Sequence, residues 1–263
     1  MLDKTKYFDE VKSYKFIANK SLGQNFLVDS NAAEKIVTKL NLEEGDNVLE
    51  IGAGLGSLSY FLAKSPGKSD LIDIDERMLT FLSDQFKDFE NVEVKRQNIL
   101  KCNLEGYNKI IGNLPYYITS SIIEKLLLDG QNAELMVLMT QKEVFPKLLR
   151  AHKSPLSLFL NYVAEISYPT DVNRNNFAPI PHVDSVVFTL KPNKNIKNPD
   201  NLRLYKTMKQ LFLLRRKNIL NTLANFVQNK EKAREILEKM GVDSNKRPEE
   251  LPVEFYINLL KML

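Results

Sequence analysis

The sequence predicts an α/β domain with a mostly parallel sheet that ends in an antiparallel hairpin, followed by a small all-helical domain. Three observations lead to this fold class. The chain has 263 residues, enough for one large domain and a small appendage. Short β-prone runs alternate with helical patterns over the first 150 residues, as in a sheet wound from βαβ units. Beyond a linker near residue 195, only helical patterns remain.

The individual elements follow from the spacing of the apolar residues. Residues 29–40 are predicted to be a helix, because Ala33, Ile36, Val37 and Leu40 fall on one face. Further helices are predicted at 57–64, 76–87, 119–128 and 142–150. Strands are predicted at 47–51, 71–74, 92–95, 109–112 and 135–139. The β-prone segments 158–168 and 184–190 lack a helix between them and suit an antiparallel hairpin at the edge of the sheet.

The second domain is separated from the first by composition. Residues 191–201, KPNKNIKNPDN, contain two prolines and four asparagines and almost nothing to bury, which is typical of a linker. We therefore expect one domain over 1–194 and a second over 195–263. The helices of the second domain are predicted at 202–227, 230–240 and 252–262.

The composition limits the kinds of reaction that the chain can carry out. Hydrophobic residues make up 43% of the chain and charged residues 27%, which is typical of a globular protein. No apolar run approaches the roughly 18–20 residues of a spanning helix, and the N-terminal segment lacks an apolar signal core. Cys102 is the single cysteine, and His152 and His182 are the only histidines. We expect a cytoplasmic monomer without a metal or a disulfide, and a reaction that needs few acid–base side chains.

The net charge of +4 is unevenly distributed. From Lys191 to Lys230 there are ten Lys or Arg residues and one acid, Asp200, so this segment carries +9. The remaining residues therefore sum to −5, since 27 basic residues face 32 acids. Such polarity predicts a basic surface for a polyanion, although a Lys-rich solvated helix is the alternative.

A glycine loop follows the first strand of the sheet. Residues 50–56 read Glu-Ile-Gly-Ala-Gly-Leu-Gly, and glycines at such a turn let the backbone approach a ligand closely. The spacing of Gly52 and Gly54 differs from the G-x-G-x-x-G of dinucleotide sites, and no Lys follows as in a Walker A loop. With Glu50 ahead of the loop, the pattern is typical of S-adenosylmethionine (SAM)-dependent methyltransferases.

Asp73 ends the second strand, 21 residues after Gly52. An acid at this position can accept hydrogen bonds from the ribose hydroxyls of an adenosine. The other interpretation is a helix N-cap, a role that Asp75 fits better. Together the loop and Asp73 favour a nucleoside cofactor, and we also place the neighbouring Ile74 in its site.

The fourth strand runs into Asn113-Leu114-Pro115-Tyr116, at the edge of the sheet where ligands bind. The N6 amine of adenine is a poor nucleophile because its lone pair is delocalised into the ring. The Asn113 side-chain oxygen and the Leu114 carbonyl can accept from the amine and free that lone pair for a methyl sulfonium. Tyr116 offers a flat face for a flipped base. The alternative is a plain strand-end turn with a satisfied Asn and a packed Tyr.

Taken together, these residues resemble the rRNA adenine N6-dimethyltransferase family, and more closely its small-subunit rRNA branch than its antibiotic-resistance branch. The resemblance covers nearly the whole chain and implies a Rossmann-like SAM-dependent catalytic domain with a helical RNA-binding domain. Besides the glycine loop, Asp73 and the tetrad, it rests on four motifs: Lys20–Leu27, Gln141–Val144, Asn176–Ser185 and Leu211–Lys217.

The resemblance also implies roles for single residues. Gln24, Asn25 and Leu27 belong to the opening motif, which approaches the cofactor, and Asn113 borders the cofactor as well as the target base. Phe177 is expected to stack on the target adenine from the face opposite Tyr116. Arg215, Arg216 and Lys217 correspond to the basic stretch of the helical domain and are expected to bind RNA.

The chain departs from the family pattern at two positions. Asn98 stands where the family usually has an Asp that accepts from the adenine amine of the cofactor. Asp73 stands where the family typically has a Glu. Both changes bear on cofactor affinity more than on the type of reaction.

The resemblance implies methylation of adenine N6 in rRNA within a small ribosomal subunit or its precursor, with two adjacent adenines dimethylated. The alternatives are a large-subunit rRNA methyltransferase that confers antibiotic resistance, a DNA adenine methyltransferase, and a non-catalytic ribosome-assembly factor.

Within the helical domain, Arg215 falls on the apolar stripe of the predicted helix. Either the helix breaks there, or Arg215 reaches RNA or a buried acid. The next densest basic cluster is Lys142, Lys147, Arg150 and Lys153.

Overall fold

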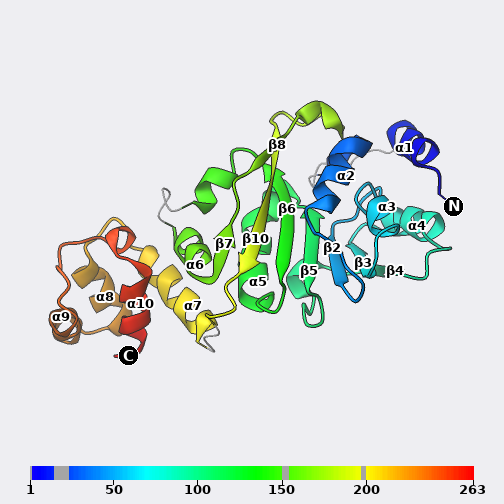
Figure 1. Ribbon diagram of the computed structural model, residues 1–263. Coiled ribbons are helices and arrows are strands. Elements are labelled where there is room, and N and C mark those ends of the chain that lie inside the picture. Colours follow the sequence, from blue (N-terminus) through cyan, green and yellow to red (C-terminus); the bar gives the residue numbers. More distant parts are fainter. Residues whose placement is uncertain (1, 15–23, 150–153, 197–199) are drawn as a thin grey trace. The chain divides into compact units, whose positions relative to one another are not determined.

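The computed structural model describes residues 2–14, 24–149, 154–196 and 200–263 (Figure 1). The chain divides into two compact units. The first comprises residues 1–145 and 164–194, and the second residues 146–163 and 195–263. The second unit thus takes in a segment that precedes the end of the sheet, whereas we had expected one continuous first domain up to residue 194. Among the described residues, every helix is too short or too polar to traverse a lipid bilayer.

The first unit is built on an eight-stranded mixed sheet. Its path runs β4-β3-β2-β5-β6-β10-β7, and β8 pairs with the same β10. Strands β2 to β6 are parallel neighbours, and β10 is antiparallel to β6, β7 and β8, which confirms the predicted fold class. The bounds are β2 Asn47–Ile51, β3 Lys68–Asp73, β4 Val92–Arg96, β5 Lys109–Asn113, β6 Leu135–Gln141, β7 Ala164–Ile166, β8 Thr170–Val172 and β10 Ser185–Pro192.

The strand order reverses beside β2, because the chain winds outward to β3 and β4 and then returns to β5 on the other side. Ligands of open α/β sheets bind beyond the carboxyl ends of the strands at such a switch point. The register places the end of β2 level with both neighbours, since Ile51 pairs with Ile72 of β3 and with Gly112 of β5. The loops that follow these three strands therefore meet.

Several helices connect and cover the strands. An apolar core joins buried side chains of α1, α2 and α4 to those of the central strands, among them Tyr7, Val37, Leu82 and Ile111. A separate two-stranded sheet pairs β1, Phe26–Leu27, with β9, Phe177–Ala178. The helices of this unit are α1 Lys4–Ser13, α2 Ser30–Thr38, α3 Ser59–Leu62, α4 Glu76–Gln85 and α5 Thr119–Asp129, with 3-10 turns η2 Ile99–Lys101, η3 Tyr116–Ile118 and η6 Arg174–Asn176.

The second unit is helical. α7 contacts α6, α8 and α10, and α8 packs closely on α9. Its elements are η4 Phe145–Leu148, α6 Pro155–Val163, α7 Asn201–Phe212, α8 Ile219–Val227, α9 Lys230–Lys239, η7 Pro248–Glu250 and α10 Val253–Leu260. η4 is a single 3-10 segment where the sequence predicted a helix over 142–150, and it begins at the last residue of the first unit.

The prediction of a strand over 158–168 is wrong for most of its length. Residues 155–163 form α6, and only β7 of this segment joins the sheet. Tertiary packing outweighs the β-prone composition here. Ser154 and Ser157 exchange hydrogen bonds at the start of the helix, from the Ser157 backbone amide to the Ser154 hydroxyl at 3.1 Å and from the Ser154 amide to the Ser157 hydroxyl at 2.9 Å. Phe159 then packs at 5.0 Å between ring centroids against Tyr205 of α7.

At Arg215 the structure shows that the predicted helix breaks, and contact of this residue with RNA stays a prediction. The predicted helix over 202–227 breaks, because α7 ends at Phe212 and α8 begins at Ile219, where Asn218 caps it by accepting from the Asn221 amide. Arg215 is exposed in the connection, so it is not a buried ion-pair partner. Arg216 and Lys217 are exposed beside it.

Candidate active site

A cavity of about 250 Å³ lies at the carboxyl ends of β2, β3 and β5. Its lining comes from the glycine loop, the end of β3, the tetrad after β5, the segment around β1 and the turn η2. The structure thus brings together all but one of the residues predicted for cofactor and target base. These residues are Gln24, Asn25, Leu27, Gly52, Gly54, Asp73, Ile74, Asn98, Asn113, Leu114 and Tyr116.

The glycine loop needs its glycines for two different reasons. Gly52 has a φ of 66° and Gly54 a φ of 56°, in the left-handed region that residues with a Cβ rarely adopt. A Cβ on Gly54 would also lie 3.0 Å from the ring of Phe26, so β1 packs directly on the loop. The Gly52 amide donates to the Ile72 carbonyl at 2.9 Å, which anchors the loop to β3.

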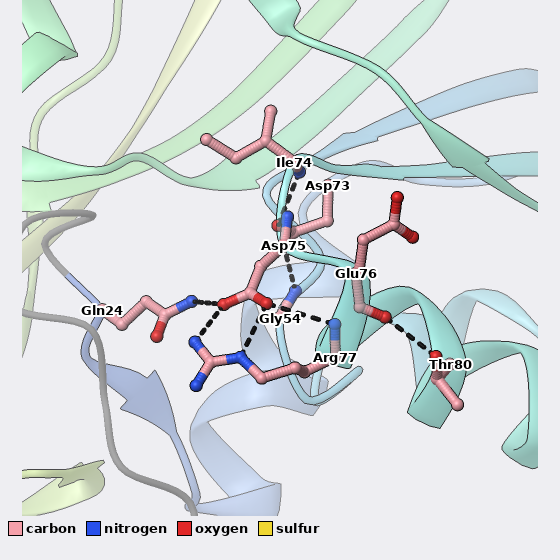
Figure 2. Close-up of polar contacts among 8 residues, drawn as sticks. All are labelled: Gln24, Gly54, Asp73, Ile74, Asp75, Glu76, Arg77 and Thr80. Carbon is pink, nitrogen blue, oxygen red and sulfur yellow. Dashed lines mark hydrogen bonds and ion pairs between the residues drawn. The ribbon is translucent and has the colours of Figure 1, made fainter.

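Asp73 binds the glycine loop to the end of β3 (Figure 2). Its carboxylate accepts from the backbone amides of Gly54 at 2.9 Å, Ile74 at 2.7 Å and Asp75 at 2.9 Å. Burial raises the pKa of Asp73 above its ordinary value, and these three hydrogen bonds act in the opposite direction. A carboxylate offers about four acceptor sites. Oδ1 takes two of the bonds and Oδ2 only one, so Oδ2 retains capacity for a ligand hydroxyl.

The neighbouring Asp75 has a structural role, as the sequence indicated. It caps α4 by accepting from the Arg77 amide at 3.1 Å, and it forms an ion pair with the Arg77 guanidinium (Figure 2). Gln24 donates to Asp75 Oδ2 from Nε2 at 2.9 Å. The Arg77 hydrogen bonds, helped by Gln24, lower the pKa of Asp75 to about 2. Gln24 therefore reaches the cavity with its amide nitrogen bound to an acid of the protein.

Asn98 lies in the cavity lining beside η2. Its side-chain oxygen accepts from the Leu100 amide at 2.9 Å and caps the turn. The side-chain oxygen at this position, where the resemblance implies an Asp, is thus engaged in a local hydrogen bond and belongs to an uncharged amide. The side chains of Leu100 and Ile74 are apolar and exposed at the same cavity.

The side chain of Asn113 is oriented by a backbone carbonyl. Nδ2 donates to the Asn25 carbonyl at 3.0 Å, which turns Oδ1 the other way. Oδ1 is buried, and no described residue donates a hydrogen bond to it. A buried acceptor without a donor costs about 1–3 kcal/mol, so it is a feature that calls for a ligand. The adjacent Leu114 amide is bound to the Met139 carbonyl at 2.9 Å, which holds the tetrad against β6.

Tyr116 is held at its hydroxyl, which lies 3.1 Å from the hydroxyl of the fully buried Ser185 on β10. Burial raises the pKa of the phenol above its ordinary value. The ring is therefore a neutral, fixed surface in the cavity lining. The next residue, Tyr117, also lines the cavity and is 56% exposed.

Glu50 is buried in the cavity wall. Burial raises its pKa to about 8, although the Ser59 hydroxyl donates to Oε2 at 2.6 Å and acts in the opposite direction. Burial therefore favours the protonated form of this carboxyl.

Phe177 is the exception among the predicted residues. It is 2% exposed, belongs to the apolar core and does not line the cavity. The reason is the β1–β9 pairing, which places Phe177 opposite Leu27, with the Val28 amide donating to the Asn176 carbonyl at 2.8 Å. The expectation that this ring stacks on a base from the cavity does not agree with this structure. Phe177 instead supports the strand that carries Leu27 to the cofactor side.

The predicted RNA-binding residues are not among the cavity-lining residues and belong to the α7–α8 connection of the helical unit. Of the second basic cluster, Lys142 forms an ion pair with Asp171 at 2.8 Å, and Arg150 and Lys153 lie outside the described residues. The first four residues of the opening motif, 20–23, also lie outside them. Among the described residues, no group of three His, Cys, Asp or Glu side chains is placed to hold a metal ion.

The architecture is Rossmann-like, and solved methyltransferase structures share it. A dimethyladenosine transferase from Plasmodium falciparum superposes with a TM-score of 0.76 over 89% of this chain and 95% of that chain, at 24% identity. The 23S rRNA methyltransferase ErmE superposes with a TM-score of 0.65 over 90% of this chain and 99% of that chain, at 23% identity. At these identities the likeness shows the fold.

The chain belongs to the ribosomal RNA adenine dimethylase family, whose model matches residues 15–263. Ribosomal RNA small subunit methyltransferase A of Clostridioides difficile (strain 630) is 36% identical over 93% of this chain and 90% of that protein. The protein of the same name from Ligilactobacillus salivarius (strain UCC118) is 37% identical over 95% of this chain and 91% of that protein. The family resemblance seen in the motifs is confirmed.

Replacing Phe177 distinguishes a core residue from a base-stacking residue. We expect Phe177→Ala to lower the free energy of unfolding by about 3–5 kcal/mol, because a buried ring leaves a cavity when it is removed. Urea denaturation measures this change. Tyr117→Ala is the control, since an exposed side chain of similar size should change stability by about 0.5 kcal/mol or less. Equal stability of the two variants would show that Phe177 is not part of the core.

Proposed function

We propose that this protein transfers methyl groups from SAM to the exocyclic N6 of adenine in rRNA. The target we propose is a pair of adjacent adenines in the small ribosomal subunit or its precursor, each of which is dimethylated, by a monomer in the cytoplasm. The observation that carries the proposal is the buried Asn113 Oδ1, which is aimed by the Asn25 carbonyl and has no donor among the described residues. An amino group is the ligand that supplies such a donor.

The cavity fits SAM in three respects. The glycine loop presents backbone without Cβ atoms at Gly52 and Gly54, Asp73 Oδ2 retains acceptor capacity at the end of β3, and Ile74 with Leu100 offers apolar surface for an adenine ring. When bound, SAM supplies a methyl group on a sulfonium, which is a strong electrophile. Asp73 would hold the ribose, and the residue at 98 would accept from the adenine amine as a neutral amide.

The tetrad acts on the target base by hydrogen bonding. In the first transfer, Asn113 Oδ1 and the Leu114 carbonyl accept from the two N–H groups of the N6 amine. In the second transfer, one of these oxygens accepts from the single N–H that remains. Each arrangement favours tetrahedral geometry and frees the nitrogen lone pair for attack on the methyl carbon. Tyr116 holds one face of the flipped base by stacking. No strong general base is needed, because the nitrogen would carry a positive charge once it has been methylated and would then lose its proton to solvent water.

The substrate class distinguishes this proposal from its alternatives. Two relatives that are 36% and 37% identical are named for the small subunit, and both match nearly the full chain. The likeness to ErmE is one of fold. A small-subunit rRNA target is therefore favoured over large-subunit rRNA or DNA. The intact tetrad, with its acceptor directed and unpartnered, supports catalysis over a purely structural role in ribosome assembly.

Asn113→Ala tests the proposed chemistry. We expect kcat for transfer from labelled SAM to unmodified small subunits to fall by about 10²–10³-fold, as when one positioned polar group is removed from a catalytic site. Binding of S-adenosylhomocysteine should weaken far less. Asn103→Ala, on the exposed turn after η2, is the control and should retain wild-type activity.

A near-normal rate for folded Asn113→Ala would refute the role of Asn113. If wild-type protein binds S-adenosylhomocysteine but methylates no small-subunit adenine, the substrate assignment fails while the cofactor assignment stands. Mass spectrometry of the rRNA product would then locate the methyl groups and count one or two on each adenine.

We further propose that the helical unit supplies most of the RNA affinity. The segment from Lys191 to Lys230 carries +9, whereas the rest of the chain carries −5 and should not attract RNA unaided. The exposed Arg215, Arg216 and Lys217 sit together in the α7–α8 connection, where long cationic side chains can reach phosphates. α9 and α10 together add no net charge, because α9 has four basic and three acidic residues and α10 has a single acid, Glu254.

Replacing Arg215, Arg216 and Lys217 by alanine should weaken RNA binding and leave S-adenosylhomocysteine binding unchanged. Each phosphate contact contributes about 0.7–0.9 to the slope of log K against log salt, so the slope should flatten by about 1–3 units. The measurement is RNA binding over a series of salt concentrations, with a melting curve for each variant.

The matched control for this triple variant replaces Lys232, Arg234 and Lys239 of α9, which removes the same charge from exposed positions. If both triple variants lower the salt slope equally, RNA binding depends on net charge alone. An unchanged slope in the Arg215 variant would show that the connection is a solvated surface without RNA contacts.

A further inference from the structure

Helix α1 contacts the glycine loop. This helix precedes the residues that match the family model, which begin at residue 15. The Tyr7 hydroxyl donates to the carbonyl of Leu55 at 2.8 Å. Leu55 belongs to the glycine loop and lines the cavity. Tyr7 is 1% exposed and Leu55 4% exposed, so this hydrogen bond is shielded from water.

The loop is shaped to admit this tyrosine. Gly56 has a φ of 74°, and a Cβ placed on it would lie 2.4 Å from the Tyr7 hydroxyl oxygen. The third glycine of the loop therefore makes room for a side chain of the protein, whereas Gly52 and Gly54 border the cavity itself. Tyr7 therefore occupies the space that a side chain at position 56 would need.

Tyr7 is itself rigidly held. Its ring stacks on Tyr60 of α3 at 5.0 Å between centroids and 29° between planes, and it meets Phe86 at 6.0 Å. The start of α1 is fixed at the same place, because the Leu2 carbonyl accepts from Tyr60 at 3.1 Å and from Lys64 at 2.7 Å. Burial raises the pKa of the Tyr7 phenol well above its ordinary value, so the hydroxyl remains a donor at any working pH.

We propose that α1 is part of the cofactor site and that Tyr7 is a positioning residue, which holds the glycine loop in the conformation that binds SAM. Without the hydroxyl, the Leu55 carbonyl loses its donor, and the loop from Gly52 to Gly56 is free to shift away from the ligand. This inference rests on the proposed use of SAM, but it concerns how strongly the loop binds the cofactor and not which substrate is methylated.

The test compares Tyr7→Phe with Tyr60→Phe. Both variants remove one hydroxyl from the same aromatic cluster, but only the Tyr7 hydroxyl contacts the glycine loop. In Tyr60→Phe the Lys64 ammonium still binds the Leu2 carbonyl and holds the start of α1. We expect Tyr7→Phe to raise the Kd for S-adenosylhomocysteine and the KM for SAM by about 3–10-fold, the effect of losing one neutral hydrogen bond. kcat at saturating SAM should stay within about twofold of wild type. Tyr60→Phe should change Kd by less than twofold.

Hydrogen exchange of residues 52–58 in the unliganded protein gives a second readout, which should rise in Tyr7→Phe and not in Tyr60→Phe. Equal Kd values for wild type and Tyr7→Phe would overturn the proposal, as would an equal loss in both variants, because that loss would reflect packing of the aromatic cluster. Failure of wild-type protein to bind S-adenosylhomocysteine would instead refute the proposed cofactor and this inference with it. If the wild-type protein binds S-adenosylhomocysteine but methylates no RNA, the proposed substrate is refuted, and the Kd values still decide the role of Tyr7. If Tyr7→Phe loses methylation while its Kd stays normal, the role of Tyr7 is contradicted.

Discussion

The carboxylate of Asp73 connects the two loops on which the cavity depends. Parallel pairing of β2 with β3 sets Ile51 level with Ile72, so the chain must turn at the same edge of the sheet after each strand. Asp73 then accepts from the Gly54 amide on one side and from its own following turn on the other. These bonds hold a carboxylate that burial disfavours, and they leave Oδ2 with room for one more donor. The glycine loop, the start of α4 and the proposed ribose contact all follow from this arrangement.

A second constraint runs from the late part of the chain to the tetrad. Phe177 pairs with Leu27 across β9 and β1, and this pairing fixes the strand just after Asn25. The Asn25 carbonyl in turn binds the Asn113 amide and directs Oδ1 away from it. Phe177 therefore acts on the site through the backbone in this structure. The opening motif, the tetrad and the late motif are thus connected by the β1–β9 pairing and by the hydrogen bond from Asn113 to the Asn25 carbonyl.

Much of the fold was predictable because its signals are local. The strand at 47–51 and the glycine loop after it were predicted with correct bounds, and the wound α/β pattern placed Asp73 and Asn113 at one edge. The errors have a tertiary origin. α6 forms where β-prone residues pack on α7, and Phe177 is buried by a two-residue strand that no periodicity reveals. α1 was missed although Asp3 caps it and Tyr7, Phe8 and Val11 share a face, because ten mostly polar residues give a weak helical signal. The free acceptor on Asn113 and the fit of Tyr7 to Gly56 depend on atomic contacts and were beyond sequence patterns.

The most direct test of this account is the affinity of Asp73→Ala for S-adenosylhomocysteine, measured by calorimetric titration. Because the Asp73 carboxylate holds both the glycine loop and the cofactor ribose in this account, its removal should weaken binding by about 1.5–3 kcal/mol. This is the range for hydrogen bonds to a charged group. Asp84→Ala, an exposed acid of α4, is the control and should bind as the wild type does. An unchanged Kd in a correctly folded Asp73→Ala protein would contradict the account, because the edge of the sheet would then not be the cofactor site.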